Sequence, residues 1–386
     1  MQAIFLYLLA GAAALQQVTS ASAMPQSNPP TSDPTTPRAV ANKVPKFESI
    51  TQGSSNVWFG DQIEGAAVDS EGNLYAVDMS AEGDNANRKL NTIGRVDTSG
   101  KASLFYVDPN DTTHFSGIRF VSPRTGVKGG RALLADAKNH RVVELTWTTP
   151  TTPETLTDKS VDYKQSTICS NSTMLQPNDL AVSPNGKHVY LSGMKGDMKS
   201  GSGDVWLCDG KQKTTLLDTM GRTNGIEVDP KGEYLYVTEA VGGWVPTASY
   251  IWRYKLDGKT GKPVGDKEKY FDFQAYDQSG NVDSDGMRFD TAGNLYVTRN
   301  GRGEVVKITA KQVGETIKVP FDNAANLEFA GKYGRTLHVI GKCPGATEGK
   351  TTGCVVKAAE ESATGRAWSD LHPVTTLPMP AQDSQY

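Results

Sequence analysis

The feature that most constrains the fold of this chain is a repeated pair of apolar strands joined by a tight turn. The clearest copy is TNGIEVDPKGEYLYVTE (223–239), in which Ile226, Val228, Leu235 and Val237 alternate with other residues. Such alternation with a period of two is typical of half-buried strands. The Asp-Pro-Lys-Gly between them is turn chemistry, because Pro sets φ and Gly tolerates positive φ. The stretch therefore predicts a β-hairpin.

The hairpin recurs five more times. The copies, the last two of them weaker, are IEGAAVDSEGNLYAVD (63–78), PNDLAVSPNGKHVYLSG (177–193), SDGMRFDTAGNLYVTR (284–299), SGIRFVSPRTGVKGGRALLAD (116–136) and ANLEFAGKYGRTLHVIG (325–341). The residues expected just before the first strand of each hairpin are Glu64, Ser116, Asn178, Asn224, Asp285 and Asn326. These positions are 41 to 62 residues apart. A period of that length built from strands indicates propeller blades rather than helical repeats.

Each hairpin needs two more strands to complete a four-stranded blade. Third-strand candidates are 93–98, 141–147, 204–210, 250–258, 304–310 and 354–360. Fourth-strand candidates are 103–108, 214–218, 269–273 and 316–320. We therefore predict an all-β fold, a six-bladed β-propeller. In such a fold the first strands of all blades start at the same end of the central channel, so the six positions above should form one ring.

The chain divides into three predicted segments. Residues 1–23 are interpreted as a signal peptide, because an apolar run (4–15) precedes small residues (21–23) suited to cleavage. Residues 24–44 are rich in Pro, Ser and Thr, which indicates a flexible leader, and residues 45–386 are assigned to the propeller. We expect a secreted protein. The net charge of −3 with scattered charges favours neither nucleic acid nor membrane partners.

The cysteine count fits an oxidising compartment. The four cysteines all follow the predicted signal peptide and allow three disulfide connectivities, of which we prefer Cys169–Cys208 and Cys343–Cys354. Four free thiols are the alternative. Asn110 and Asn171 stand in Asn-x-Thr patterns and are predicted glycosylation sites.

The predicted ring gathers oxygen donors and contains no His or Cys. Carboxylate and amide oxygens are the ligands that Ca²⁺ accepts. The alternative is that residues such as Asn224 and Asp285, each followed by Gly, serve only as turn residues. However, burying Glu64 and Asp285 in the channel without a cation would be costly. The pattern therefore favours a divalent metal site, with Ca²⁺ as its ion.

The ordered set of ring positions resembles the senescence marker protein (regucalcin)/gluconolactonase family, six-bladed propellers related to paraoxonases. The resemblance spans roughly residues 58–341 and rests on Glu64-Gly65, Asn178-Asp179, Asn224-Gly225 and Asp285-Gly286. It implies that Glu64, Asn178, Asn224 and Asp285 hold a catalytic divalent ion, usually calcium, and that the reaction is lactone hydrolysis. Two positions depart from the family: Gln176 replaces an Arg of the gluconolactonase-like members, and Ser116 replaces a His of the paraoxonase-like members.

Several other residues should line the mouth of the ring, because they belong to it or lie near the strand ends that meet there. The candidate substrate-binding residues are Ser116, Gln176, His140, Glu239, Trp244 and Arg299. For most of them an ordinary structural role is an equally available interpretation. Trp244 and Arg299 illustrate this, because a loop Trp often packs on its own loop and Arg299 could pair with Glu304 on the rim.

The function predicted from these observations is a secreted, calcium-dependent hydrolase of lactones or related esters. Asp285 would activate the attacking water, and Glu64, Asn178 and Asn224 would complete the metal site. No G-x-S-x-G elbow, H-E-x-x-H motif or phosphate-binding loop points to another chemistry. Two alternatives stay open: a non-catalytic binding propeller with a structural metal, and a propeller enzyme of the strictosidine-synthase type that needs no metal.

Overall fold

The computed structural model describes residues 40–43, 48–49, 62–79, 91–108, 110–123, 129–148, 162–195, 199–209, 212–242, 245–344 and 351–373. All of these belong to one compact unit, Pro37–Tyr386, and only this unit is discussed below. The predicted signal peptide and most of the predicted leader lie outside the described residues.

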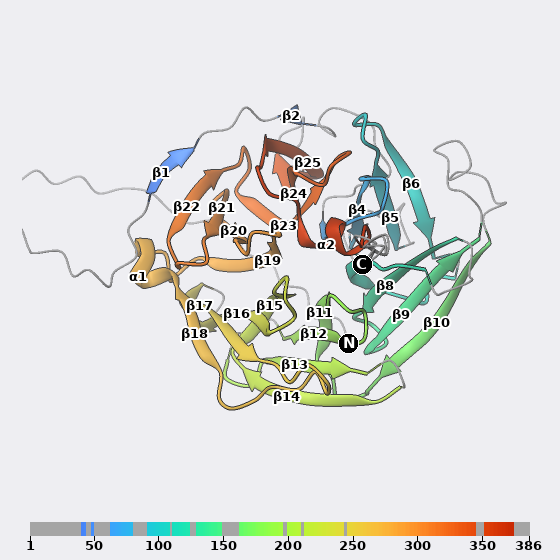
Figure 1. The fold of residues 1–386 in the computed structure, drawn as a ribbon, viewed down its shortest axis with the longest axis horizontal. Helices are drawn as coiled ribbons and strands as arrows, with labels where there is room; N and C mark the ends of the chain where they lie inside the picture. Colours follow the sequence, from blue (N-terminus) through green and yellow to red (C-terminus); the bar gives the residue numbers. More distant parts are fainter. Residues whose placement is uncertain are drawn as a thin grey trace, which may run out of the picture. The chain divides into compact units, whose positions relative to one another are not determined.

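Six antiparallel sheets follow one another along the chain and are arranged around a central axis (Figure 1). The first sheet contains β3 (Ile63–Val68), β4 (Leu74–Asp78), β5 (Thr92–Val96) and β6 (Ala102–Val107). The second contains β7 (Phe115–Phe120), β8 (Gly130–Asp136), β9 (Arg141–Trp147) and β10 (Tyr163–Ser170). The third contains β11 (Gln176–Val182), β12 (Val189–Met194), β13 (Gly203–Cys208) and β14 (Thr214–Met220). In each of these blades, consecutive strands are neighbours.

The last three blades are built in the same way. The fourth contains β15 (Arg222–Val228), β16 (Tyr234–Gly242), β17 (Pro246–Lys255) and β18 (Glu268–Asp272). The fifth contains β19 (Asp283–Phe289), β20 (Leu295–Asn300), β21 (Glu304–Ile308) and β22 (Gly314–Lys318). The sixth contains β23 (Asn323–Ala330), β24 (Thr336–Pro344) and β25 (Thr351–Glu360). The six-bladed β-propeller is therefore confirmed, and every third strand predicted from the sequence is present.

Two short strands before the first blade complete the later blades. β2 (Glu48–Ser49) pairs antiparallel with β25 and supplies the fourth strand of the sixth blade, which links the two ends of the propeller. β1 (Val40–Lys43), from the end of the predicted leader, pairs in parallel with β22 as a fifth strand of the fifth blade. The sequence did not reveal which strand closes the ring, because β2 is only two residues long.

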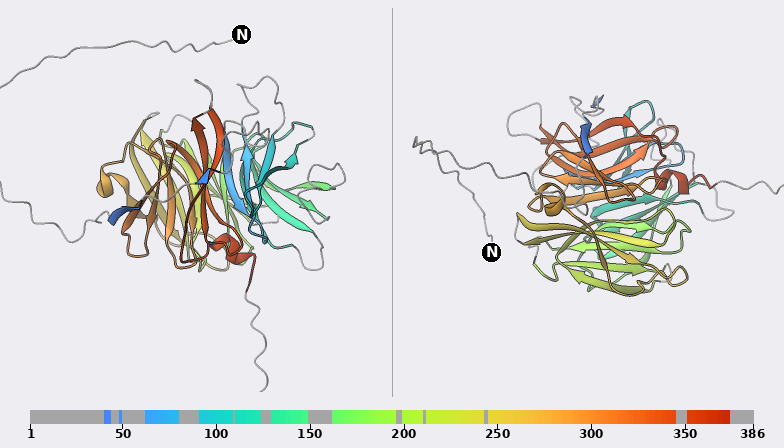
Figure 2. Two further views of the ribbon diagram at one scale, coloured as in Figure 1. Left: turned by 90° about the horizontal axis from the view of Figure 1, so that it is seen from above. Right: turned by 60° about the vertical axis from the view of Figure 1, so that its left-hand side comes forward.

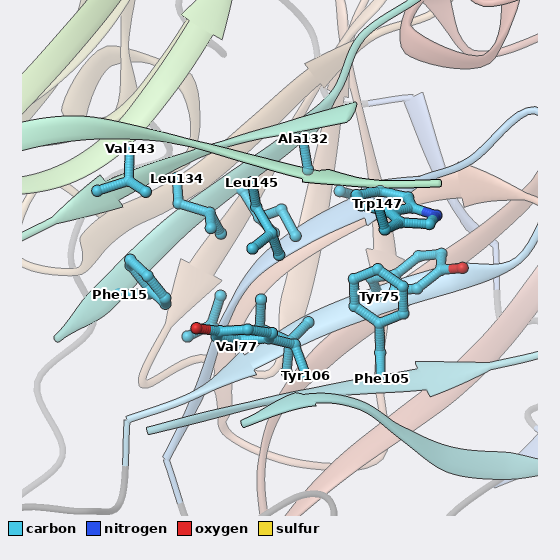
Figure 3. Packing of buried hydrophobic residues seen from close by; sticks show 13 residues of the cluster. Tyr75, Val77, Phe105, Tyr106, Phe115, Ala132, Leu134, Val143, Leu145 and Trp147 are labelled. Atoms are coloured by element: carbon cyan, nitrogen blue, oxygen red, sulfur yellow. The ribbon is translucent and has the colours of Figure 1, made fainter. Parts of the chain in front are cut away.

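The hydrophobic core lies between neighbouring blades. Between the first two blades, the rings of Tyr75 and Phe105 meet edge to face with centroids 4.8 Å apart, and Phe105 meets Trp147 similarly at 5.1 Å. Figure 3 shows this cluster, in which Val77 of the first blade lies near Leu134 of the second. Each such aromatic pair adds about 0.5–1.5 kcal/mol beyond area burial. Every blade therefore stabilises the next.

The innermost strands surround a channel whose middle is filled by charged side chains. Three guanidinium groups and three carboxylates are buried there: Arg119, Arg288, Arg366, Asp179, Glu227 and Glu328. Arg288 Nε donates to Glu328 Oε2 over 3.0 Å, and Arg119 Nη1 lies 3.2 Å from Asp179 Oδ1. Since the charges balance and are hydrogen-bonded, this part of the channel is a structural network.

A short helix caps one end of the channel. α2 (Arg366–Asp370) contacts β3, β19 and β23, and Arg366 Nη1 donates to the carbonyl of Val182 at the end of β11. Figure 2 shows α2 at one end of the strands. The innermost strands all run toward this end, so their starting residues lie at the opposite end. The other helix, α1 (Phe273–Asp277), follows β18, and no helix among the described residues is long and apolar enough to cross a membrane.

The disulfide prediction is confirmed for Cys169 and Cys208, which join β10 of the second blade to β13 of the third. Cys354 is buried and disulfide-bonded, but the side chain of its predicted partner, Cys343, lies outside the described residues. Of the two predicted glycosylation sites, Asn110 is exposed, whereas Nδ2 of Asn171 donates to Thr214 Oγ1 over 3.0 Å.

Candidate functional site

The six ring positions come together because the six innermost strands form a closed circle. Each of β3, β7, β11, β15 and β19 contacts the next innermost strand, and β23 contacts β3. Near every ring position the register against the second strand shifts. The shifts fall between Glu64 and Ala67, Phe115 and Gly117, Pro177 and Asp179, Thr223 and Ile226, Ser284 and Met287, and Ala324 and Asn326. The ring positions thus lie in irregularities within the strands, not before them. Such bulges redirect a side chain.

The glycine that follows several ring positions permits close approach between blades. A Cβ on Gly225 would lie 2.2 Å from the carbonyl oxygen of Asp285, and one on Gly286 would lie 2.3 Å from Asn326 Cγ. Any side chain at these two positions would separate adjacent innermost strands. The Asn-Gly and Asp-Gly pairs therefore reflect packing between neighbouring blades rather than turns.

Asp285 is the most enclosed carboxylate of the ring. Its side chain accepts a 2.8 Å hydrogen bond from Nδ2 of Asn300 and another from the side chain of Asn224. Burial raises the pKa of Asp285 to about 6, although the Asn300 bond and the charge of Arg222 act to lower it. The carboxylate is therefore oriented by two amides and is more basic than an exposed Asp.

Glu64 approaches the same space from the first blade. Burial raises its pKa well above the ordinary value, and the negative charges of Asp285 and Asp179 raise it further. Within the described residues Glu64 forms no ion pair. The two carboxylates thus repel each other at desolvated positions, and the charge of Arg222 offsets the raised pKa of Asp285 only in part.

The remaining ring positions divide into two kinds. Ser116 is buried and its Oγ donates over 2.7 Å to the carbonyl of Pro177, while Asn326 Oδ1 accepts from the backbone of Leu327 over 2.9 Å. Both side chains hold backbone in place. Asn178 lies at its bulge and is half-buried. Asn178 and Asn224 are therefore the amide candidates for a metal site.

A cavity of about 230 Å³ opens at the ring end of the channel, between the first, fifth and sixth blades. Its polar lining comprises Gln62, Glu64, Asn300, Asn323 and Lys342. A larger cavity of about 430 Å³, lined by Tyr75, Phe120 and Trp147 among others, lies by the β3–β4 turn at the opposite end of the strands. The smaller cavity is lined by Glu64 and by Asn300, the hydrogen-bond partner of Asp285, and we take it as the candidate active site.

The other expected mouth residues have varied positions. Gln176 is exposed at the start of β11. His140 is half-buried in the β8–β9 turn with φ of 51°. Trp244 lies outside the described residues.

Two expected mouth residues turn out to be structural. Glu239 accepts 2.6 Å hydrogen bonds from the Gly221 amide and from Trp252 Nε1, so both its oxygens are used. Arg299 is fully buried, donates to Ser284 Oγ over 2.6 Å, and lies over the Phe273 ring. These contacts, rather than the alternative pairing with Glu304, hold Arg299, and both side chains are engaged within the fold.

Two cations near the mouth were missed by sequence reasoning. Arg222, two residues before ring position Asn224, forms an ion pair with Asp283. Lys342 lines the cavity from β24, opposite Asn323 of β23. Lys342 could have been found from its position near the end of the second strand of its blade. Residues at that position in other blades were predicted to line the mouth.

The ring side chains supply the kinds of oxygen atom that a divalent cation binds. Ca²⁺ binds carboxylate, amide and water oxygens together, and Glu64, Asn178, Asn224 and Asp285 offer two carboxylates and two amides. The raised pKa values of Glu64 and Asp285 show that negative charge there is unfavourable without a cation. The described part of the chain contains no group of three or more His, Cys, Asp or Glu arranged to hold a metal. The chemistry of the four side chains suits a divalent cation such as Ca²⁺, with two of the four donors being amides.

The comparisons with known proteins agree with this architecture. A family profile described as SMP-30/Gluconolactonase/LRE-like region matches residues 111–341. No curated protein matches the chain by sequence. Among solved structures, a luciferin-regenerating enzyme is similar at 18% identity and TM-score 0.61, covering 83% of this chain and 97% of that one. A calcium-binding regucalcin from Agrobacterium tumefaciens has 17% identity, TM-score 0.59 and coverage of 83% and 98%. A gluconolactonase from Xanthomonas campestris has 14% identity, TM-score 0.55 and coverage of 84% and 96%. At such identities these structures establish the fold.

Proposed function

The chain belongs to the SMP-30/Gluconolactonase/LRE-like family, and from this premise we propose that it is a calcium-dependent hydrolase that opens lactones. The observation that carries the proposal is the pair of carboxylates, buried Asp285 and half-buried Glu64, at the end of the channel opposite α2, where Glu64 lines a cavity. The family name supports the lactone substrate. The regucalcin neighbour, named as calcium-binding, supports the choice of ion.

Glu64, Asn178, Asn224 and Asp285 would hold the cation. A bound divalent cation would supply Lewis-acid polarisation of the lactone carbonyl. Asp285 takes a proton from the attacking water, a task for which a carboxylate of raised pKa is suited. Asn300 keeps the Asp285 side chain in one orientation through its 2.8 Å hydrogen bond. Water adds to the carbonyl carbon, the ring C–O bond breaks, and the proton held by Asp285 passes to the leaving alkoxide oxygen. The products are an alcohol and a carboxylic acid, which releases its proton to solvent as the carboxylate.

We also propose that the protein is secreted and glycosylated. Residues 1–23 have the pattern of a signal peptide, and the Cys169–Cys208 disulfide is typical of proteins from oxidising compartments. Asn110 is the better glycosylation candidate, since it is exposed and the side-chain amide of Asn171 is engaged.

The proposal is tested with the purified protein in calcium and in excess chelator. Calcium that binds only the native state should raise stability by about 2.7 kcal/mol at 100 times its dissociation constant. Hydrolysis of aliphatic, aromatic and sugar lactones should depend on calcium. Identical melting curves together with absence of metal by elemental analysis would exclude the site. Calcium binding without hydrolysis of any lactone would favour a non-catalytic binding propeller.

A further inference from the structure

We infer that the substrate carries an anionic substituent, a carboxylate, and that Lys342 binds it. This inference rests on the proposed function and assigns the substrate class of the same cavity. Lys342 lies on β24 of the sixth blade and lines the cavity that also contains Glu64 and Asn300. It therefore faces the space that a lactone would occupy.

Lys342 is the one cation among the described residues that line the cavity. It forms no ion pair with any described residue, and the charges that dominate the surroundings of Glu64 are those of Asp285 and Asp179. Arg222 is different, because its guanidinium is already paired with Asp283. The ammonium of Lys342 is thus the group at this mouth that can pair with a ligand at no cost to an existing ion pair.

Charge balance favours an anion at this position. The two carboxylates Glu64 and Asp285 neutralise a divalent cation, since two negative charges and two positive charges sum to zero. The charge of Lys342 then remains on the cavity wall, where an anionic group of the ligand can pair with it. Amides from Gln62 and Asn323, which line the same cavity, can hydrogen-bond hydroxyl or carboxylate oxygens.

The size of the cavity limits what accompanies the carboxylate. About 230 Å³ corresponds to roughly eight waters at about 30 Å³ each. Pockets for drug-sized ligands usually measure about 300–1,000 Å³. The substrate we infer is therefore one five- or six-membered lactone ring with short substituents, one of them a carboxylate. Its hydrolysis product is a dicarboxylate.

Two lactones that differ only in one substituent test this inference. Glucaro-1,4-lactone has a carboxylate where glucono-1,4-lactone has a hydroxymethyl group. With calcium present, the wild-type protein should hydrolyse the acidic lactone with the higher kcat/KM. Lys342→Met should lower the ratio of the two kcat/KM values about ten- to a hundredfold, mainly through KM, because a hydrogen bond to a charged group is lost. Lys342→Arg should largely preserve the ratio.

The matched control is Lys332→Met, on the exposed β23–β24 turn of the same blade at the other end of the strands. It should leave the ratio unchanged. A wild-type protein without preference, or a ratio unaffected by Lys342→Met, would overturn the inference. If the protein hydrolyses neither lactone, the proposed function is contradicted. The role of Lys342 is then tested by measuring the binding of the two open-chain acids. Calorimetry should show glucarate binding the calcium-loaded protein more tightly than gluconate, and Lys342→Met should abolish the difference; equal binding to wild type would overturn the inference.

Discussion

Asn300 donates a 2.8 Å hydrogen bond from Nδ2 to Oδ2 of Asp285, fifteen residues earlier on the neighbouring strand of the same blade. Asn300 also lines the cavity, so the bond connects the ring to the space open to substrate. A carboxylate held in this way needs little reorganisation before it accepts a proton. Asp285 is therefore the residue whose substitution tests the proposed chemistry most directly.

Replacing Asp285 with Asn should remove hydrolysis while preserving the fold. The new amide still offers an oxygen to Asn300 and to a cation, but it cannot accept the proton of water. Loss of general-base assistance should lower kcat by about 10²–10⁴-fold, measured on the best lactone of a panel. Asp283→Asn, two residues away on the same strand, is the control and should lose less than tenfold. Activity equal to wild type in Asp285→Asn would remove the base assignment.

Replacing Glu64 with Gln should weaken the metal site before it affects the chemistry. The substitution removes one of two negative charges from the donor set, so the affinity for calcium should fall. Added calcium should then restore part of the activity, which it should not do for Asp285→Asn. The measurement is rate against calcium concentration for both variants. A Glu64→Gln protein that stays inactive at saturating calcium would contradict this division of roles.

The carboxylates of the ring should give the metal-free protein an unusual pH dependence. Burial raises the pKa of Asp285 from about 4 in the unfolded chain to about 6 in the native state. The native state thus keeps the Asp285 proton up to a higher pH than the unfolded chain does. The free energy of unfolding therefore decreases as the pH rises from about 4 to about 6. In chelator, the free energy of unfolding of wild type relative to Asp285→Asn should fall across this window. Calcium should remove or reverse the trend, since it binds the ionised carboxylates; the same trend in both proteins would refute the assignment.

The fold was predictable because its strands are local patterns. Period-two alternation located the hairpins, and their spacing gave six blades. The placement of Glu64 and Asp285 in one ring was also predictable, because equivalent positions of the six blades lie at the same end of the channel. The bulges were not predictable, because they arise from the pairing of each innermost strand with its neighbours.

The charged network shows what sequence reasoning missed. Arg119, Glu227 and Arg288 each stand three residues after a ring position, a regularity that marks a second layer of the channel. Their partners could not be identified from the chain order. Arg288 donates to the carbonyl of Ala66, 222 residues away, and Arg366 reaches the network from a helix beyond the last blade. Such contacts depend on closure of the ring.

His338 should make the protein sensitive to acid. It is buried on β24, and burial lowers its pKa from 6.5 to about 4, with the charge of Lys357 acting in the same direction. The unfolded chain therefore binds a proton at a higher pH than the native state, and stability falls as pH drops from about 6.5 to about 4. The loss should be about 3 kcal/mol. His338→Gln should show a shallower decline in urea unfolding midpoints over this range, and an unchanged slope would contradict the assignment.

Arg366 should contribute far more to stability than an exposed arginine, because it completes the charge balance of the channel. Its Nη2 donates to Glu227 Oε1 and its Nη1 to Asp370 Oδ2, each over 2.5 Å, in a buried position. Without it, three channel carboxylates would face two guanidinium groups, and removing one member of a buried pair costs about 3–5 kcal/mol. Arg366→Met should show that loss in urea unfolding with calcium present.

The control is Arg253→Met, whose partner Glu268 is 57% exposed and which should lose no more than about 1 kcal/mol. The double variant Arg366→Met with Glu227→Gln tests the cause. Because it removes the unpaired charge as well as the arginine, it should recover part of the stability lost by Arg366→Met alone. If the double variant is less stable by the sum of the two single losses, the charge-balance explanation is wrong, and the role of Arg366 is then to pack α2 against the innermost strands.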